Sequence, residues 1–95
     1  MYYPMSDYRL KGFERAGAAN KKYNAILVGK ATGREHRVPF GDARYQQYRD
    51  STGLGLYTRL DHGDSTRRAS YRSRHAKDVR EANYSAGYFP MKYLW

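Results

Sequence analysis

The sequence predicts a small α+β domain, and three patterns support this fold class. Two β-prone runs, residues 22–28 and 34–40, flank a glycine-bounded loop and indicate a β-hairpin. Residues 65–80 place apolar and basic side chains at helical spacing. Residues 83–95 are strongly aromatic and include the single Trp. We expect the hairpin to pack on the basic helix, with a short helix and the aromatic C-terminal segment completing a basic domain of residues 22–95.

The composition predicts a thin aromatic core and negatively charged partners. Leu, Ile, Val and Phe supply only 13 of 95 residues, whereas Tyr alone supplies 11. Because Tyr and Arg are enriched at interfaces, we expect a domain that is marginal alone and firmer within an assembly. The net charge is +9, and Arg outnumbers Lys by 12 to 6, which favours bidentate contacts with phosphate or carboxylate.

The chain has no cysteine, which excludes disulfides and gives no sign of an oxidising compartment. Its longest aliphatic run, residues 25–28, is far too short for a membrane span, and the N-terminus lacks the apolar core of a signal peptide. We therefore expect an intracellular protein that is soluble or bound in an assembly.

Residues 1–21 are predicted to form an aromatic N-terminal arm or a docked helix. Ser6 can cap such a helix, and Leu10 and Phe13 lie three residues apart, as on one helical face. Gly12 weakens the helix, so an arm that folds onto a partner is an equal alternative.

In the hairpin, alternation along the second strand places Val38 and Phe40 on one face, which should point to the core. Pro39 cannot donate a ladder hydrogen bond, so this strand is expected at an edge. After the hairpin, Asp42 can cap a short helix in which Tyr45 and Tyr48 lie one turn apart. The glycine-containing loop that follows, residues 51–57, lacks the Gly-Lys-Ser/Thr sequence of a phosphate-binding loop.

The basic helix should begin after Asp64 or Ser65, either of which can act as its N-cap. Tyr71, His75 and Val79 recur every four residues and are expected to face the hairpin. Two interpretations of the remaining basic side chains stay open, since they could bind the phosphates of nucleic acid or the carboxylates of a neighbouring subunit or of the same chain. The predicted polyanion- or partner-binding residues are Arg67, Arg68, Arg72, Arg74, Lys77 and Arg80.

Catalytic and metal-binding patterns are missing from the sequence. The three histidines, His36, His62 and His75, show no second ligand at metal spacing, and there is no Gly-x-Ser-x-Gly nucleophile elbow. We therefore expect no enzyme, no cofactor, no metal and no small-molecule substrate. Arg67 and Arg68 precede Ser70 in the form of a basophilic kinase site, so phosphorylation there would weaken polyanion binding.

Several short motifs along residues 21–95 permit comparison with a known family. They are Lys21-Lys22-Tyr23, Val38-x-Phe40-Gly41, Tyr45-x-x-Tyr48, Asp64-x-x-Arg67-Arg68-x-x-Tyr71-x-x-Arg74-His75, Ser85-Ala86-Gly87 and Tyr93-Leu94-Trp95. This pattern resembles a group of small basic proteins of unknown function encoded by large double-stranded DNA viruses of algae and protists. The resemblance implies a viral origin and supplies no catalytic residues.

Two functional hypotheses follow. The preferred one is a small virion-associated structural protein, a minor capsid or cementing component, that contacts other virion proteins or its own copies. Its Arg side chains would engage acidic surfaces, and its aromatic anchors would be Tyr88, Phe89, Tyr93 and Trp95. The alternative is a nucleic-acid-binding protein whose basic helix contacts phosphates. We expect the protein in the virion, or in the host nucleus or cytoplasm during assembly.

Overall fold

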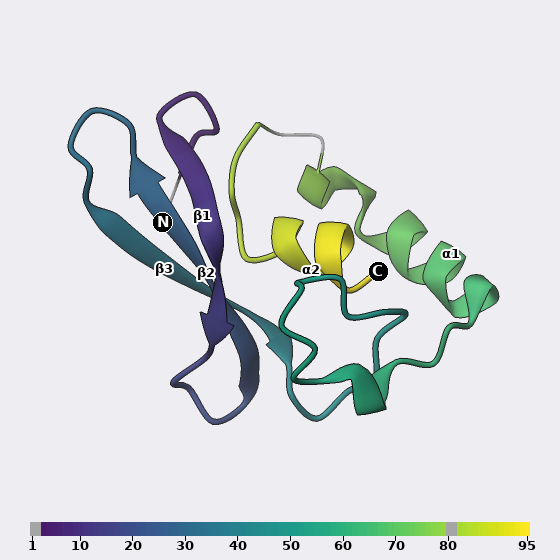
Figure 1. The fold of residues 1–95 in the computed structure, drawn as a ribbon. Helices are drawn as coiled ribbons and strands as arrows, with labels where there is room; N and C mark the ends of the chain where they lie inside the picture. The colour runs from purple at the N-terminus through teal and green to yellow at the C-terminus, as the bar shows by residue number, and fades with distance from the viewer. Residues whose placement is uncertain (1–2, 80–81) are drawn as a thin grey trace.

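The computed structural model describes residues 3–79 and 82–95, which form a three-stranded antiparallel sheet with short helices on one side (Figure 1). The predicted α+β class is confirmed. In chain order the elements are β1 (Tyr8–Arg15), β2 (Lys21–Gly29), β3 (Glu35–Asp42), the 3-10 turn η1 (Thr58–Leu60), α1 (Ser65–Arg74), the 3-10 turn η2 (Ala76–Val79) and α2 (Tyr88–Tyr93).

The predicted hairpin is confirmed by β2 and β3. The two strands pair antiparallel, with Tyr23 opposite Phe40 and Ala25 opposite Val38. Val38 and Phe40 are buried as expected, because alternate residues of β3 face the core. The strand order β1-β2-β3 leaves β3 at an edge, where the missing amide hydrogen of Pro39 is tolerated.

The helix expected near the N-terminus is wrong, because residues 8–15 form β1 and pair antiparallel with β2. Leu10 lies opposite Leu27 and Phe13 lies opposite Ala25, so β1 advances by three residues over a stretch in which β2 advances by two. This β-bulge turns both Leu10 and Phe13 towards the core. The three-residue spacing that suggested a helical face therefore arises from an interrupted strand.

The chain before β1 does not form a free arm, because it pairs with the segment before α2. The Tyr3 amide donates to Oδ1 of Asn83 (2.8 Å), and the Tyr84 amide donates to the Tyr3 carbonyl (2.9 Å). The Met5 amide donates to the Ala82 carbonyl (2.8 Å). These bonds hold Tyr3 in a buried position within the core of its own domain.

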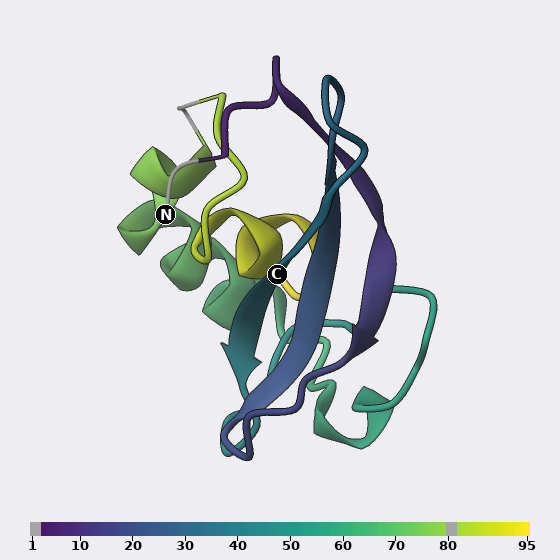
Figure 2. The same ribbon diagram turned by 90° about the vertical axis from the view of Figure 1, so that its left-hand side faces the viewer.

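The core lies between one face of the sheet and α2, and Figures 1 and 2 place α2 between the sheet and α1. Phe89 of α2 packs with its ring centroid 5.3 Å from that of Phe40. Pro90 fits in the first turn of α2, where its missing amide hydrogen needs no partner. The buried apolar residues are Tyr3, Tyr23, Ala25, Leu27, Val28, Val38, Phe40, Tyr57, Phe89, Met91 and Leu94.

The short helix expected after Asp42 is wrong, because residues 43–57 form turns and bends. Their order comes from polar side chains that point inward. Gln47 is fully buried and donates to the Tyr57 carbonyl (2.8 Å), while Asp50 accepts from the buried Tyr23 hydroxyl. These internal hydrogen bonds replace the backbone ladder of a regular element and fix the segment against the sheet.

The basic helix begins as predicted, with the Asp64 side chain accepting from the amides of Thr66 (2.9 Å) and Arg67 (3.1 Å). It ends earlier than predicted, at Arg74, and η2 follows. The helix buries none of its residues, and α2 lies between it and the sheet (Figure 2). Tyr71 stacks on Trp95, so the expected packing of Tyr71 on the hairpin is wrong.

Candidate functional site

A hollow of about 940 Å³ lies between α1 and the turn that follows β3. Three segments line most of it. They are α1 from Thr66 to Arg74, residues 40–46, and residues 86–95. We call this hollow the α1 groove. Its size is in the range of ligand-binding sites in proteins.

Five cationic side chains line the α1 groove against two carboxylates, those of Asp42 and Asp78. Both carboxylates are already engaged. Asp42 receives two hydrogen bonds from the Arg44 guanidinium (3.0 and 2.8 Å), which hold the pKa of Asp42 well below its usual range, and Asp78 lies 3.2 Å from Nδ1 of His75. The cations are Lys21, Lys22, Arg44, Arg67 and Arg74.

Four of these cations have no ion-pair partner among the described residues. The ammonium group of Lys22 is held by uncharged oxygens, which leaves Lys21, Arg67 and Arg74 as the candidates for contact with an anion. Arg67 donates to the neutral amide oxygen of Gln46 across the mouth of the groove (2.9 Å). The groove therefore carries more positive than negative charge, and a bound anion would relieve the repulsion among its cations.

The structure separates the predicted basic residues into two faces of α1. Arg67 and Arg74 lie seven residues apart and line the α1 groove. Arg68 and Arg72 lie on the other side, where they donate to the main-chain oxygens of Trp95 (2.7 Å) and Met91 (3.1 Å). Arg67 and Arg74 therefore do not share a surface with Arg68 and Arg72.

The contacts of Arg68 and Arg72 have a structural explanation. The last carbonyls of a helix have no partner within that helix and are the negative end of its dipole. Arg72 satisfies one such carbonyl of α2, that of Met91. Arg68 instead binds the main-chain oxygen of Trp95, just beyond α2, and lies 4.8 Å from the ring centroid of Tyr48. Lys77 is exposed in η2 and does not line the α1 groove, and Arg80 falls outside the described residues.

The aromatic residues predicted to anchor on partners are used within the domain. Phe89 is 0% exposed, so it is unavailable to a partner in this fold. Tyr88 and Tyr93 are half-buried against the core. Trp95 stacks on Tyr71 with ring centroids 4.3 Å apart and an angle of 6° between the planes. The tail thus covers its own sheet and supports α1.

Lys21, Arg44 and Tyr45 line the groove but were not among the predicted site residues. Arg44 and Tyr45 were missed because they were assigned to a helix. Tyr45 is 64% exposed, although large apolar side chains are usually covered. A possible sequence signal was the string Asp42-Ala43-Arg44-Tyr45 after a strand end, since Asp favours turns through hydrogen bonds to nearby amides. Ser70, the residue of the kinase-like motif, is exposed and also lines the groove.

Lys22 has a structural role in the wall of the groove. It is 2% exposed, and its ammonium group donates to the Tyr45 carbonyl (2.8 Å) and to the side chain of Gln47. Burial lowers the pKa of Lys22, while the charges of Asp42 and Asp50 oppose this change. Because its side chain is buried and two of its three donors are engaged, Lys22 fixes the turn after β3 and is not a ready ligand for an anion.

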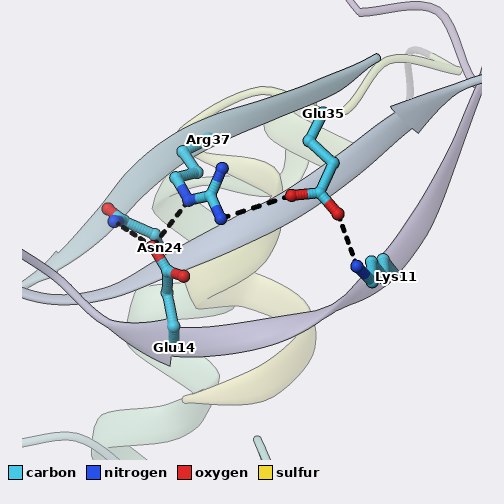
Figure 3. Close-up of polar contacts among 5 residues, drawn as sticks. All are labelled: Lys11, Glu14, Asn24, Glu35 and Arg37. Atoms are coloured by element: carbon cyan, nitrogen blue, oxygen red, sulfur yellow. Dashed lines mark hydrogen bonds and ion pairs between the residues drawn. The ribbon is translucent and has the colours of Figure 1, made fainter. Parts of the chain in front are cut away.

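The opposite face of the sheet carries charges that are paired with one another (Figure 3). Arg37 of β3 binds Glu14 of β1 (2.8 Å) and Glu35 (3.3 Å), while Lys11 pairs with Glu35. Hydrogen bonds from Asn24 and then Arg37 lower the pKa of Glu14. The charges of these four residues therefore cancel, in contrast to the excess of positive charge in the α1 groove.

His62 lies beside the start of α1 and accepts the Asp64 amide through Nδ1 (2.9 Å). Nowhere in residues 3–79 and 82–95 do three or more His, Asp or Glu side chains gather in a way that suits a metal ion. The helices in the same two ranges are too short or too polar to cross a bilayer.

No protein-family model, curated protein or solved structure matches this chain.

Proposed function

We propose that the protein binds nucleic acid in the α1 groove, with Lys21, Arg67 and Arg74 contacting phosphates. The observation that supports this most is the gathering of these three cations in one groove without ion-pair partners among the described residues. Phosphate contacts supply most of the sequence-independent affinity of proteins for nucleic acids. A net charge of +9 adds long-range attraction to the same polyanion.

The other hypothesis, a cementing component of a virion, stays a prediction and takes second place. It relied on aromatic anchors that reach a neighbouring protein, and Phe89 is enclosed in the core. Trp95 is stacked on Tyr71, so this predicted anchor also packs within its own domain. The groove cations do not depend on those anchors, so they favour the nucleic-acid hypothesis.

The proposal is tested by measuring affinity for a fluorescently labelled oligonucleotide over a range of salt concentrations. Replacing both Arg67 and Arg74 by Ala is expected to make the slope of log K against log salt shallower by about 1.4 to 1.8 units, because each phosphate contact contributes about 0.7 to 0.9. Arg34→Ala is the matched control, since Arg34 is exposed in the hairpin loop and away from the groove.

The double variant of Arg68 and Arg72 separates binding from folding. These residues bind main-chain oxygens of α2 and of the segment that follows it, so their replacement by Ala is expected to lower thermal stability more than it changes the salt slope. Absent or salt-insensitive binding by the wild-type protein, or equal loss with Arg34→Ala and the groove variants, would refute the proposed function.

A further inference from the structure

Tyr45 stands out at the mouth of the α1 groove as an exposed aromatic ring. Among the described residues, only Tyr45 (64% exposed) and Leu54 (43% exposed) are large apolar side chains on the surface. Nine of the other ten Tyr residues lie in the described ranges, and each of them is buried or half-buried. Packing in the core therefore does not explain the position of Tyr45. Leu54 is also exposed, but it lies on the glycine-containing loop and does not line the groove.

The backbone of Tyr45 is held at both of its polar groups. Its amide donates to the Asp42 carbonyl (3.1 Å), and its carbonyl accepts from the buried ammonium group of Lys22 (2.8 Å). A backbone fixed in this way orders the residue before any ligand arrives. Binding to the ring then loses less conformational entropy than binding to a side chain on a mobile loop.

Arg44 holds one side of the ring. Its guanidinium carbon lies 5.5 Å from the ring centroid of Tyr45, and its nitrogens donate to both carboxylate oxygens of Asp42. The charge of Arg44 is therefore partly neutralised by Asp42, and its planar group supports the aromatic ring. Most of the Tyr45 ring stays accessible next to the cations of the groove.

We propose that the nucleic acid bound in the α1 groove is single-stranded and that one of its bases stacks on Tyr45. This inference rests on the proposed function, because the phosphates on either side of that base would be held by Lys21, Arg67 and Arg74. In a duplex, the faces of the bases are covered by their neighbours, and a Tyr on the protein surface cannot stack on them. In a single strand, the base faces are free to stack on aromatic side chains next to a basic groove.

The inference is tested by measuring affinities for a labelled single-stranded oligonucleotide and for its duplex at one salt concentration. Wild-type protein is expected to prefer the single strand. Tyr45→Ala is expected to weaken single-strand binding about tenfold, or ~1.4 kcal/mol, while leaving duplex binding unchanged. Tyr45→Phe keeps the aromatic face and is expected to bind as the wild type does. Leu54→Ala is the matched surface control and should change neither affinity.

The outcomes separate this inference from the proposed function. Salt-dependent binding of both nucleic acids with equal affinity, or a loss on Tyr45→Ala that is the same for both, would overturn the stacking proposal and leave the groove as a phosphate site. The absence of salt-dependent binding to either nucleic acid would overturn both proposals. Circular dichroism spectra of each variant, matching the wild type, would show that the fold is retained.

Discussion

Replacing Phe89 by Ala tests whether the aromatic C-terminal segment belongs to the core of this domain. The Phe89 side chain is 0% exposed, and its ring centroid lies 5.3 Å from that of Phe40, 5.8 Å from that of Tyr84 and 5.2 Å from that of Tyr88. Phe40 lies on β3, Tyr84 precedes α2, and Tyr88 lies within α2. Because three separate parts of the backbone hold these rings, we do not expect them to move together to fill the lost volume. The substitution should therefore leave a cavity at the centre of the aromatic cluster.

The expected cost follows from this burial. Phe→Ala substitutions in protein cores typically cost ~3–5 kcal/mol. The whole free energy of unfolding of a 95-residue domain is about 5–14 kcal/mol, at ~0.05–0.15 kcal/mol per residue. Phe89→Ala should thus remove a large share of the total stability, and a loss of ~3 kcal/mol corresponds to a fall in Tm of at least ~12 °C.

The assay is denaturant and thermal unfolding followed by circular dichroism. Leu54→Ala is the control, because Leu54 is 43% exposed and its truncation should change stability by no more than about 0.5 kcal/mol. A loss of less than ~1 kcal/mol for Phe89→Ala, with an unchanged m value, would contradict the reasoning. Such a result would return Phe89 to the role of partner anchor that the sequence suggested.

Three further predictions concern local geometry and protonation. Gly41→Ala should cost ~1–3 kcal/mol more than Gly33→Ala in denaturant unfolding, because both sites have positive φ (77° and 70°) but only at Gly41 would a Cβ lie 3.1 Å from a Leu94 methyl group. Asp64→Ala should cost about 1 kcal/mol and reduce the helical circular dichroism signal, since it removes the N-cap of α1, whereas a change below ~0.3 kcal/mol would contradict that role. Stability should fall as the pH drops below 6.5, because burial lowers the pKa of His62 in the folded state and the unfolded chain then binds more protons. His62→Gln should flatten that part of the stability profile, and an unchanged slope would show that another group is responsible.

The features predicted correctly from the sequence depend on residues close together along the chain. The β2–β3 hairpin follows from two β-prone runs around a loop that ends at Gly33, and the start of α1 follows from Asp64. In both cases the residues that determine the element lie in the element itself or in the turn next to it. Burial of Val38 and Phe40 follows from the two-residue period of the same hairpin.

β1 was missed because a bulge interrupts its period. Leu10 and Phe13 both face the core from a strand, yet their spacing is that of a helix. The irregular segment before η1 was missed for a different reason. Its order depends on Gln47 and Asp50, polar residues whose burial against β2 residues such as Tyr23 cannot be read from local pattern.

The candidate site was predicted only in part. The helical spacing of the basic residues was recognised. The contacts of each guanidinium group depend on where the C-terminal end of α2 lies relative to α1, and this tertiary arrangement is not visible in the local sequence. Arg67 and Arg68 are neighbours in sequence, yet one lines the α1 groove and the other binds the main-chain oxygen of Trp95. Lys21 and Arg44 enter the groove from the start of β2 and from the turn after β3, so no single motif contains the site.

The position of α2 over the sheet also affects how the chain folds during translation. The strands lie within residues 8–42, whereas Phe89 and Leu94, which pack against the buried residues of the sheet, lie near the other end of the sequence. Until those residues have left the ribosome, the nascent sheet exposes its apolar face and has little to stabilise it. Folding therefore has to wait for contacts that join distant parts of the chain, which slows it and makes the incomplete polypeptide the form most prone to aggregation.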